Sequence, residues 1–150
     1  MKKLSILLLA TLGCLAVTPA LAETAQEQAN KKLVLAMADM LFVQHKVDQA
    51  VDTYFRPDYI QHNPLAANGT DAIRALFKGR YEKTPTATIV IKRAMADGDL
   101  VMVHYNGKSG PEDRGSAIVD IFRVQDGKIA EHWDVIQAVP EVSRNQNGMF

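Results

Sequence analysis

The segment "FRVQDGKIAEHWDVIQ", residues 122–137, decides the fold of this chain. Asp126-Gly127 lies between two runs of β-branched and aromatic residues, and this residue pair is typical of tight hairpin turns. The pattern predicts two antiparallel strands, at residues 116–124 and 128–137. Four consecutive polar or aromatic residues stand on the second strand: Glu131, His132, Trp133 and Asp134. They form either a solvated face or the floor of a pocket.

The residues before this hairpin extend the sheet. β-branched residues become frequent from Thr86 onward, and two further strands are predicted at residues 87–95 and 99–106. Asp97-Gly98 is the predicted turn between them, whereas the polar residues 107–115 form a longer loop. Together the four strands make an antiparallel meander.

The N-terminal half has the spacing of helices. Apolar residues recur at helical intervals from Gln26 to about His45. A short second helix is predicted from Asp48 to Tyr54. A third runs to about Tyr81, with Thr70 or Asp71 as its cap.

These elements predict an α+β fold class. Three N-terminal helices are expected to pack into a curved antiparallel sheet, and "YIQHNP", residues 59–64, is read as an extended segment. A curved sheet wrapped around helices forms a cone with one open end. We expect a pocket for a small ligand at that end.

Residues 1–22 differ in kind from the rest of the chain. Lys2 and Lys3 precede an apolar run, and "ALA" at residues 20–22 has the small-x-small pattern of a cleavage site. This is typical of a bacterial secretory signal peptide, and the run is too short for a spanning helix. We therefore expect cleavage after Ala22 and a mature domain, residues 23–150, without a membrane span, in the periplasm or secreted.

The mature chain has no cysteine, because Cys14 is the only one in the sequence. The domain therefore needs no disulfide in an oxidising compartment. The whole chain has 17 basic and 17 acidic residues, and loss of Lys2 and Lys3 leaves a slight acidic excess. This charge does not favour a nucleic-acid partner, and the sequence has no basic cluster interleaved with aromatic residues.

The hairpin register assigns side chains to the two faces of the sheet. If "QDG" is a three-residue loop, Val124 lies opposite Lys128 and Asp120 lies opposite His132. One face then carries Ile118, Asp120, Phe122, His132, Asp134 and Ile136. The other carries Val119, Ile121, Ile129, Glu131, Trp133 and Val135. A two-residue turn would instead place Trp133 opposite Asp120 and reverse the assignment.

Each face has its own interpretation. The first mixes carboxylates and an imidazole with apolar side chains, as a pocket floor does. The second is too apolar to be a solvated face. We expect a second copy of the chain to cover it, which gives a homodimer through the sheets.

The segments "YIQHNP" and "FRVQDGKIAEHWDVIQ" resemble those of the SnoaL-like polyketide cyclases, which belong to the nuclear transport factor 2-like superfamily. The tail "AVPEVSRNQNGMF", residues 138–150, is similar to a bacterial subgroup described as predicted aldol-condensation enzymes. The resemblance spans about Leu33 to Gln137. The "DGKIxEHWD" pattern is specific for the superfamily and not for one reaction.

The resemblance implies roles for particular residues. In the cyclases, a carboxylate on the last strand is the acid/base group of an intramolecular aldol closure, and its position here is that of Asp134. The cyclases have a histidine six residues before the turn aspartate, where this chain has Asp120, a departure that puts the cyclase substrate in question. Their early pocket segment corresponds to Asn63-Pro64, preceded by His62.

The chemistry can also be derived from the residues. An aldol step needs a base, a donor for the enolate oxygen and an acid for the new alkoxide. Burial in an apolar pocket makes a carboxylate such as Asp134 a stronger base, and a nearby Asp120 would share one proton with it. His104, on the neighbouring predicted strand, is the candidate donor or proton relay.

The candidate catalytic residues are thus Asp134, Asp120 and His104. The candidate substrate-binding residues are His62, Asn63, His132 and Phe122. His62, His104, Asp120 and His132 offer nitrogen and oxygen ligands for a metal, but no short ligand spacing supports such a site. We expect no metal and no cofactor.

Two classes of function remain open. The first is a cofactor-free acid/base enzyme, a lyase, cyclase or isomerase that acts on a small carbonyl compound. The second is a non-catalytic periplasmic binding module for a small hydrophobic ligand. This fold hosts both. Inward-facing and adjacent Asp134 and Asp120 would favour the enzyme.

The signal-peptide hypothesis makes a direct prediction. Protein recovered from the periplasm should begin at Glu23, because cleavage follows Ala22. N-terminal sequencing or intact mass spectrometry measures this. Recovery of a chain that begins at Met1, or of one lipid-modified at Cys14, would contradict it.

Overall fold

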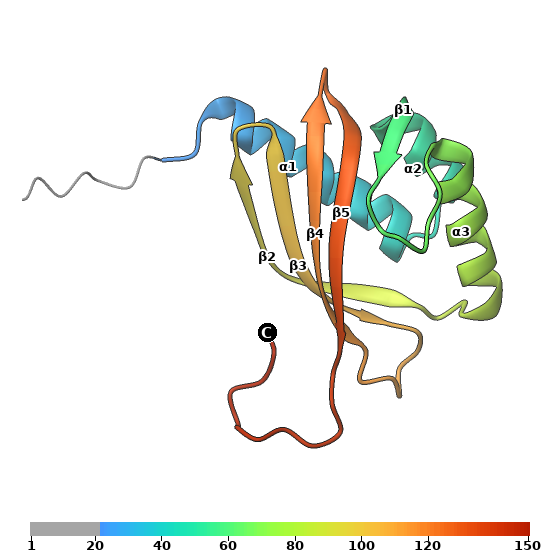
Figure 1. The fold of residues 1–150 in the computed structure, drawn as a ribbon, viewed down its shortest axis with the longest axis vertical. Coiled ribbons are helices and arrows are strands. Elements are labelled where there is room, and N and C mark those ends of the chain that lie inside the picture. The colour runs from blue at the N-terminus through green and yellow to red at the C-terminus, as the bar shows by residue number, and fades with distance from the viewer. Residues whose placement is uncertain (1–21) are drawn as a thin grey trace, which may run out of the picture.

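The computed structural model describes residues 22–150, so the predicted signal peptide lies outside the described residues apart from Ala22. The elements follow one another along the chain as Figure 1 shows. They are α1 (Ala25–Ala38), the π-helical turn η1 (Asp39–Val43), α2 (Val47–Tyr54), β1 (Phe55–Gln61), α3 (Thr70–Lys83), β2 (Thr88–Asp97), β3 (Leu100–Lys108), β4 (Ser116–Gln125) and β5 (Lys128–Ala138). Within the described part, no helix is both long enough and apolar enough to span a membrane.

The α+β class with three helices is confirmed, and each of the four predicted strands is present. The sheet, however, has five strands in the order β1-β5-β4-β3-β2 and is mixed, not wholly antiparallel. The extended segment that begins "YIQ" is part of β1, which pairs in parallel with the free edge of β5. The backbone N–H of His62 continues this pairing by donating to the His132 carbonyl at 2.9 Å.

Two helix ends differ from the prediction. The first helix does not continue as an α-helix to His45: it ends at Ala38 and passes into the π-helical turn η1. The third helix has Gly69 as its cap, with φ of 89° and no side-chain cap bond, so Thr70 is the first helical residue and Thr70 and Asp71 do not cap it. This left-handed backbone suits glycine, which explains why the preferred capping side chains were not used.

The hydrophobic core lies between the helices and the inner face of the sheet. α1 packs against β2 and β3, whereas α2 and α3 pack against each other and against β1. The fully buried side chains come from both layers: Val34, Met37, Leu41, Val51, Val101, Val103 and Ile129. Val101 and Val103 alternate along β3, so the odd-numbered residues there face the core and the even-numbered ones face outward.

The turn between β4 and β5 has two residues, and the prediction of a three-residue loop was wrong. Gln125 pairs with Lys128, while Asp126 and Gly127 have φ of 51° and 68°. Both values are positive, as in the hairpin turn that Asp-Gly favours. Alone, this turn would put Trp133 opposite Asp120.

A β-bulge at Ala130 restores the inward face. Val124 pairs with Ile129 and Arg123 pairs with Glu131, so Ala130 is an extra residue on β5. Beyond it, Asp120 pairs with Asp134, where the prediction had paired Asp120 with His132. The shorter turn and the bulge each shift the pairing by one residue from the predicted register. Past the bulge, every residue therefore lies on the face of the sheet that was predicted for it. Before the bulge this does not hold: Ile129, expected on the outer face, is fully buried in the core.

This bulge can be tested through two residues of β5 that a regular strand would place on one face. We expect Ile129→Ala to lower the free energy of unfolding by about 2–5 kcal/mol, because it empties a filled core site. Val135 is 72% exposed, so Val135→Ala should cost less than about 1 kcal/mol. Urea denaturation measures both values. Equal costs would contradict the bulge.

Candidate active site

A cavity of about 260 Å³ opens between the inner face of the sheet and the helices. Its walls are mainly apolar side chains of η1, β1, α3 and the loop before α3: Leu41, Phe42, Phe55, Leu65, Ala66, Ile73, Leu76 and Phe77. Its floor contains polar side chains of β1, of the second residue after it, and of β4 and β5: Tyr59, Gln61, Asn63, Asp120, His132 and Asp134. The apolar walls and the few polar groups are typical of a small-molecule site.

The β4–β5 register brings three titratable side chains together on this floor. Asp120 and Asp134 are directly opposed, and His132 is paired with Phe122 one position further along the same face. One ligand atom of each titratable group lies within 4.8 Å of the others. Asp120, His132, Asp134 and Phe122 therefore all line the cavity, on the face expected for them.

β1 and the extended residues after it supply the other polar groups. Side chains alternate along this segment, so Tyr59, Gln61 and Asn63 point to the same side, and all three line the cavity. Asn63 was a predicted substrate contact, whereas Tyr59 and Gln61 were missed. The period of two in "YIQHN" is the signal that could have identified them.

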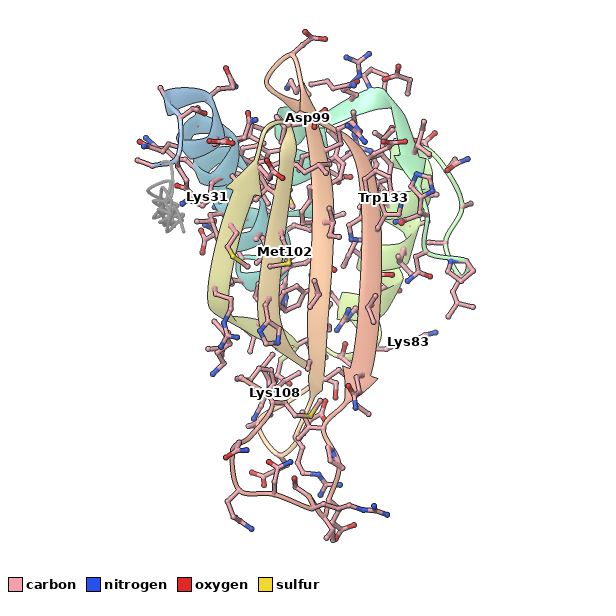
Figure 2. All side chains as sticks on the ribbon, turned by 60° about the vertical axis from the view of Figure 1, so that its left-hand side comes forward. Lys31, Lys83, Asp99, Met102, Lys108 and Trp133 are labelled. Carbon is pink, nitrogen blue, oxygen red and sulfur yellow. The ribbon has the colours of Figure 1, made fainter. Side chains whose placement is uncertain are left out.

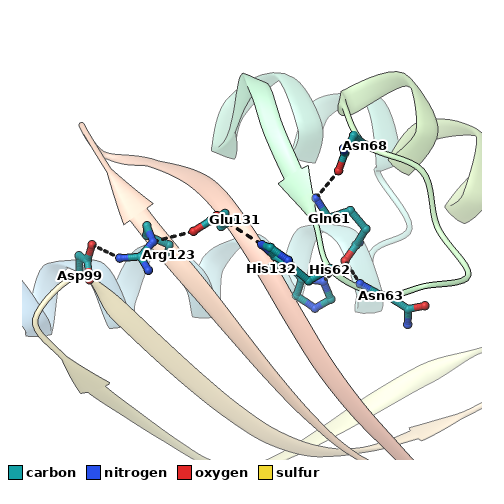
Figure 3. A network of polar contacts seen from close by, with 8 residues as sticks. All are labelled: Gln61, His62, Asn63, Asn68, Asp99, Arg123, Glu131 and His132. Carbon is teal, nitrogen blue, oxygen red and sulfur yellow. Dashed lines mark hydrogen bonds and ion pairs between the residues drawn. The ribbon is translucent and has the colours of Figure 1, made fainter.

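Gln61 determines which nitrogen of His132 carries a proton (Figure 3). The Gln61 Oε1 atom accepts the backbone N–H of Asn63 at 2.9 Å, so the amide oxygen is on this side. The same Oε1 lies 2.9 Å from His132 Nδ1. A carbonyl oxygen only accepts, and therefore His132 Nδ1 donates.

Asp120 lies on the other side of the imidazole and is almost completely buried. Its Oδ2 accepts the Tyr105 hydroxyl at 2.8 Å, and its Oδ1 is 3.3 Å from His132 Nε2. Because Nδ1 already carries a proton, Nε2 of a neutral imidazole would direct its lone pair at the Asp120 carboxylate, and the two would repel each other. A proton on either His132 Nε2 or Asp120 Oδ1 removes this repulsion. The Asp120–His132 pair is therefore suited to hold one transferable proton.

Asp134 is held differently. The Asn63 side-chain amide donates to both carboxylate oxygens, at 2.8 and 2.7 Å. The orientation of that amide follows from its other side, where Asn63 Oδ1 accepts the Leu65 backbone N–H at 2.8 Å. Asp134 is half-buried and borders the cavity, so a bound ligand can reach the carboxylate.

The Tyr59 hydroxyl is a buried donor at the same floor. It accepts the Gln61 side-chain amide at 3.1 Å, and no acceptor for its own proton is found in the described part of the chain. Burial, followed by the charges of Asp120 and Asp134, raises the pKa of Tyr59 well above its ordinary value. The hydroxyl therefore stays protonated and can donate to a ligand oxygen in the cavity.

Two predicted site residues lie elsewhere. His104 points to the outer face of the sheet, pairs with Val119 and stacks on Phe150 with ring centroids 5.6 Å apart. His62 stacks on Trp133 at 4.5 Å, and its Nε2 lies 3.3 Å from Glu131. Figure 2 views the sheet from this side, with Trp133 in front of the helices. Strand alternation is the reason: each histidine neighbours inward-facing residues and so points outward.

The outward positions of His62 and His104 separate them from Asp120 and His132, so these four potential metal ligands do not meet. Among the described residues, the set that could surround an ion is instead Asp120, His132 and Asp134. Their ligand atoms are already used in the contacts with Tyr105, Gln61 and Asn63 and with each other. An ion between them would displace the Asp120–His132 contact.

The three helices and the five-stranded mixed sheet have the architecture of the nuclear transport factor 2-like fold. A model of the SnoaL-like domain family matches residues 34–132, more than half of the chain. The chain belongs to the SnoaL-like domain family, and the resemblance seen in its sequence is confirmed. A search of curated proteins found no match.

Solved structures share this fold at low identity. A protein of Jannaschia sp. CCS1 named as a SnoaL-like polyketide cyclase is 20% identical, with a TM-score of 0.64 over 78% of this chain and 91% of that one. A protein of Kribbella flavida DSM 17836 named as a ketosteroid isomerase is 17% identical, with a TM-score of 0.63 over 82% and 86%. Bal32a, from a soil-derived mobile gene cassette, is 15% identical, with a TM-score of 0.64 over 74% and 91%. Such identities establish a common fold, and the reaction must be argued from the site.

Proposed function

We propose that this protein is a cofactor-free acid/base enzyme that forms an enolate from a small carbonyl compound, for aldol condensation or isomerisation. The observation that carries the proposal is the floor of the cavity. An accessible carboxylate, a buried hydroxyl donor and a proton-holding pair meet there beneath apolar walls. These are the three functions that enolate chemistry requires.

Asp134 is the proposed base. It removes a proton from the carbon next to the carbonyl group, and the electron pair moves onto the carbonyl oxygen as an enolate forms. Asn63 fixes the carboxylate by donating to both of its oxygens. Asp134 is half-buried and lines the cavity, so the carboxylate is accessible to a bound ligand.

Tyr59 is the proposed donor to the enolate oxygen, because its protonated hydroxyl borders the cavity. Return of the proton from Asp134 to another carbon completes an isomerisation. Attack of the enolate on a second carbonyl forms an aldol, whose alkoxide takes the proton held by His132 and Asp120. Asp120 itself is 2% exposed and acts through His132.

Exchange of carbonyl α-protons for deuterium tests the proposal without knowledge of the substrate. Small cyclic ketones, neutral and charged, are incubated with the protein in deuterated water and followed by proton NMR. Asp134→Asn should lower the protein-dependent exchange rate by about a hundredfold or more, because an amide cannot act as the base. Asp120→Asn should cause a smaller loss, since Asp120 does not touch the ligand.

Asp126→Asn is a matched control for this test. It makes the same chemical change in an exposed hairpin turn, where Asn-Gly is as favourable as Asp-Gly, and should leave exchange unchanged. Circular dichroism checks that every variant folds. Exchange by Asp134→Asn at the rate of the unmutated protein would overturn the proposal. So would a complete absence of exchange in the unmutated protein, and the binding-module alternative would then stand.

A non-catalytic binding module is the second candidate function. The largely apolar walls of the cavity favour it, since they suit a hydrophobic ligand regardless of any reaction. In that case Asp134→Asn would change ligand affinity but no exchange rate.

Export is proposed along with either function. Its support is the pattern of residues 1–22, with the basic start, the apolar run and the small residues before the cleavage site. Cleavage after Ala22 would also leave α1 complete with its capping box, in which Thr24 and Glu27 bond reciprocally.

A homodimer through the outer face of the sheet is proposed as the assembly. Val119, Ile121, Trp133 and Val135 are on this face, and Val135 is 72% exposed. The C-terminal segment turns back toward the sheet (Figure 1), and its Phe150 covers His104. A twofold axis would bring the remaining apolar surface of two chains together.

The dimer can be tested with two exposed valines. Val135→Glu should dissociate it, because a carboxylate would be buried at the contact. Val142→Glu is the matched control: Val142 is 82% exposed and lies in the C-terminal segment beyond β5. Sedimentation velocity at micromolar concentration measures both. A stable monomer of the unmutated protein would contradict the dimer.

A further inference from the structure

One cationic side chain borders the cavity and has no part in the chemistry proposed above. Arg80 lies on α3 with Ile73, Leu76 and Phe77, at the spacing that puts residues on one face of a helix. All four line the cavity. The other three positions of this stripe are apolar, and Arg80 introduces a charge where the pattern calls for a fourth apolar residue. Of the described residues that line the cavity, no other is a lysine or an arginine.

The Arg80 guanidinium makes no hydrogen bond or ion pair in the part of the chain that the structure describes. Arg74, six residues earlier on the same helix, shows the contrast: it binds Asp48 at 3.1 Å and Asp52 at 2.6 Å. A planar guanidinium presents paired donors that match the two oxygens of a carboxylate. Arg80 thus retains its donors for a ligand in the cavity.

Arg80 is also separate from the proposed acid/base groups. Asp120 and Asp134 line the same cavity, yet neither forms an ion pair with Arg80. Arg80 on α3 and the floor residues Tyr59 and Asp134 line one and the same cavity. One ligand in this cavity can therefore contact both.

We infer that Arg80 binds an anionic group of the substrate, so that the substrate class is a small keto acid. The ketone end lies over Asp134 and Tyr59, while the carboxylate end meets Arg80. The position of the ketone end rests on the proposed function, whereas the position of the carboxylate end does not. The cavity of about 260 Å³ is below the usual range for small-molecule sites, which begins at about 300 Å³, and so it suits one ring with a substituent.

A binding experiment with two ketones of the same shape tests this inference. The probes are 4-oxocyclohexanecarboxylate and its neutral carboxamide, and isothermal titration calorimetry gives the dissociation constant of each. The unmutated protein should bind the carboxylate about tenfold or more tightly than the carboxamide, because the hydrogen bonds to Arg80 are then charge-assisted. Arg80→Gln should abolish this preference, because carboxylate binding should weaken by about tenfold or more relative to carboxamide binding.

Lys83→Gln is the matched control. Lys83 is on the same helix but does not line the cavity, and Figure 2 shows it directed away from the sheet. This variant should retain the preference for the carboxylate. Equal binding of both probes to the unmutated protein, a preference that survives in Arg80→Gln, or no binding of the carboxylate would overturn the inference.

The result is independent of catalysis, because it measures affinity. A protein that prefers the carboxylate but exchanges no α-protons would overturn the proposed reaction and support the anion site. Exchange that depends on Asp134, without any preference for the carboxylate probe, would support the proposed reaction and overturn the anion site.

Discussion

The hydrogen-bond register between β4 and β5 is the constraint on which the site depends. The Asp126-Gly127 turn alone would pair Asp120 with Trp133 and direct Asp134 to the outer face. The bulge at Ala130 shifts the pairing by one residue and brings Asp120 opposite Asp134. Ile129 lies before the bulge and fills the core, so the same strand serves packing at its start and the cavity further on.

The parallel pairing of β1 with β5 completes what the hairpin begins. It brings Gln61 to His132 and Asn63 to Asp134, and these contacts orient both groups. Each contact has a fixed direction because a backbone N–H occupies the other side of each amide oxygen. Buried polar groups stabilise a fold only when they are paired. In the proposed reaction, the same pairing determines which atoms can exchange protons with a ligand.

The sheet separates two kinds of chemistry. Its inner face holds the titratable groups under apolar walls, where loss of water strengthens electrostatic interactions. Its outer face carries a surface network in which Glu131 joins His62 to Arg123, and Arg123 reaches Asp99 (Figure 3). Side-chain alternation alone assigns His62 and Asn63, which are adjacent in the chain, to these two different environments.

The inward face of Asp120, Phe122, His132 and Asp134 required the bulge at Ala130, which the local pattern does not indicate. The sequence by itself determined the class of fold and the family. These follow from signals that act over a few residues: a period of two in strands, a helical period in α3 and the turn preference of Asp-Gly. Only the tertiary structure decided that β1 joins the sheet in parallel, that Ala130 bulges, and that His62 and His104 face outward. It also brought Tyr59, Gln61 and Arg80 to one cavity and placed the Tyr105 hydroxyl against Asp120. The physical reason is that each of these features depends on contacts between segments far apart in the chain. Local propensity carries no information about which distant strand edge a strand will pair with, where the pairing will bulge, or which distant side chain will bond to a buried polar group.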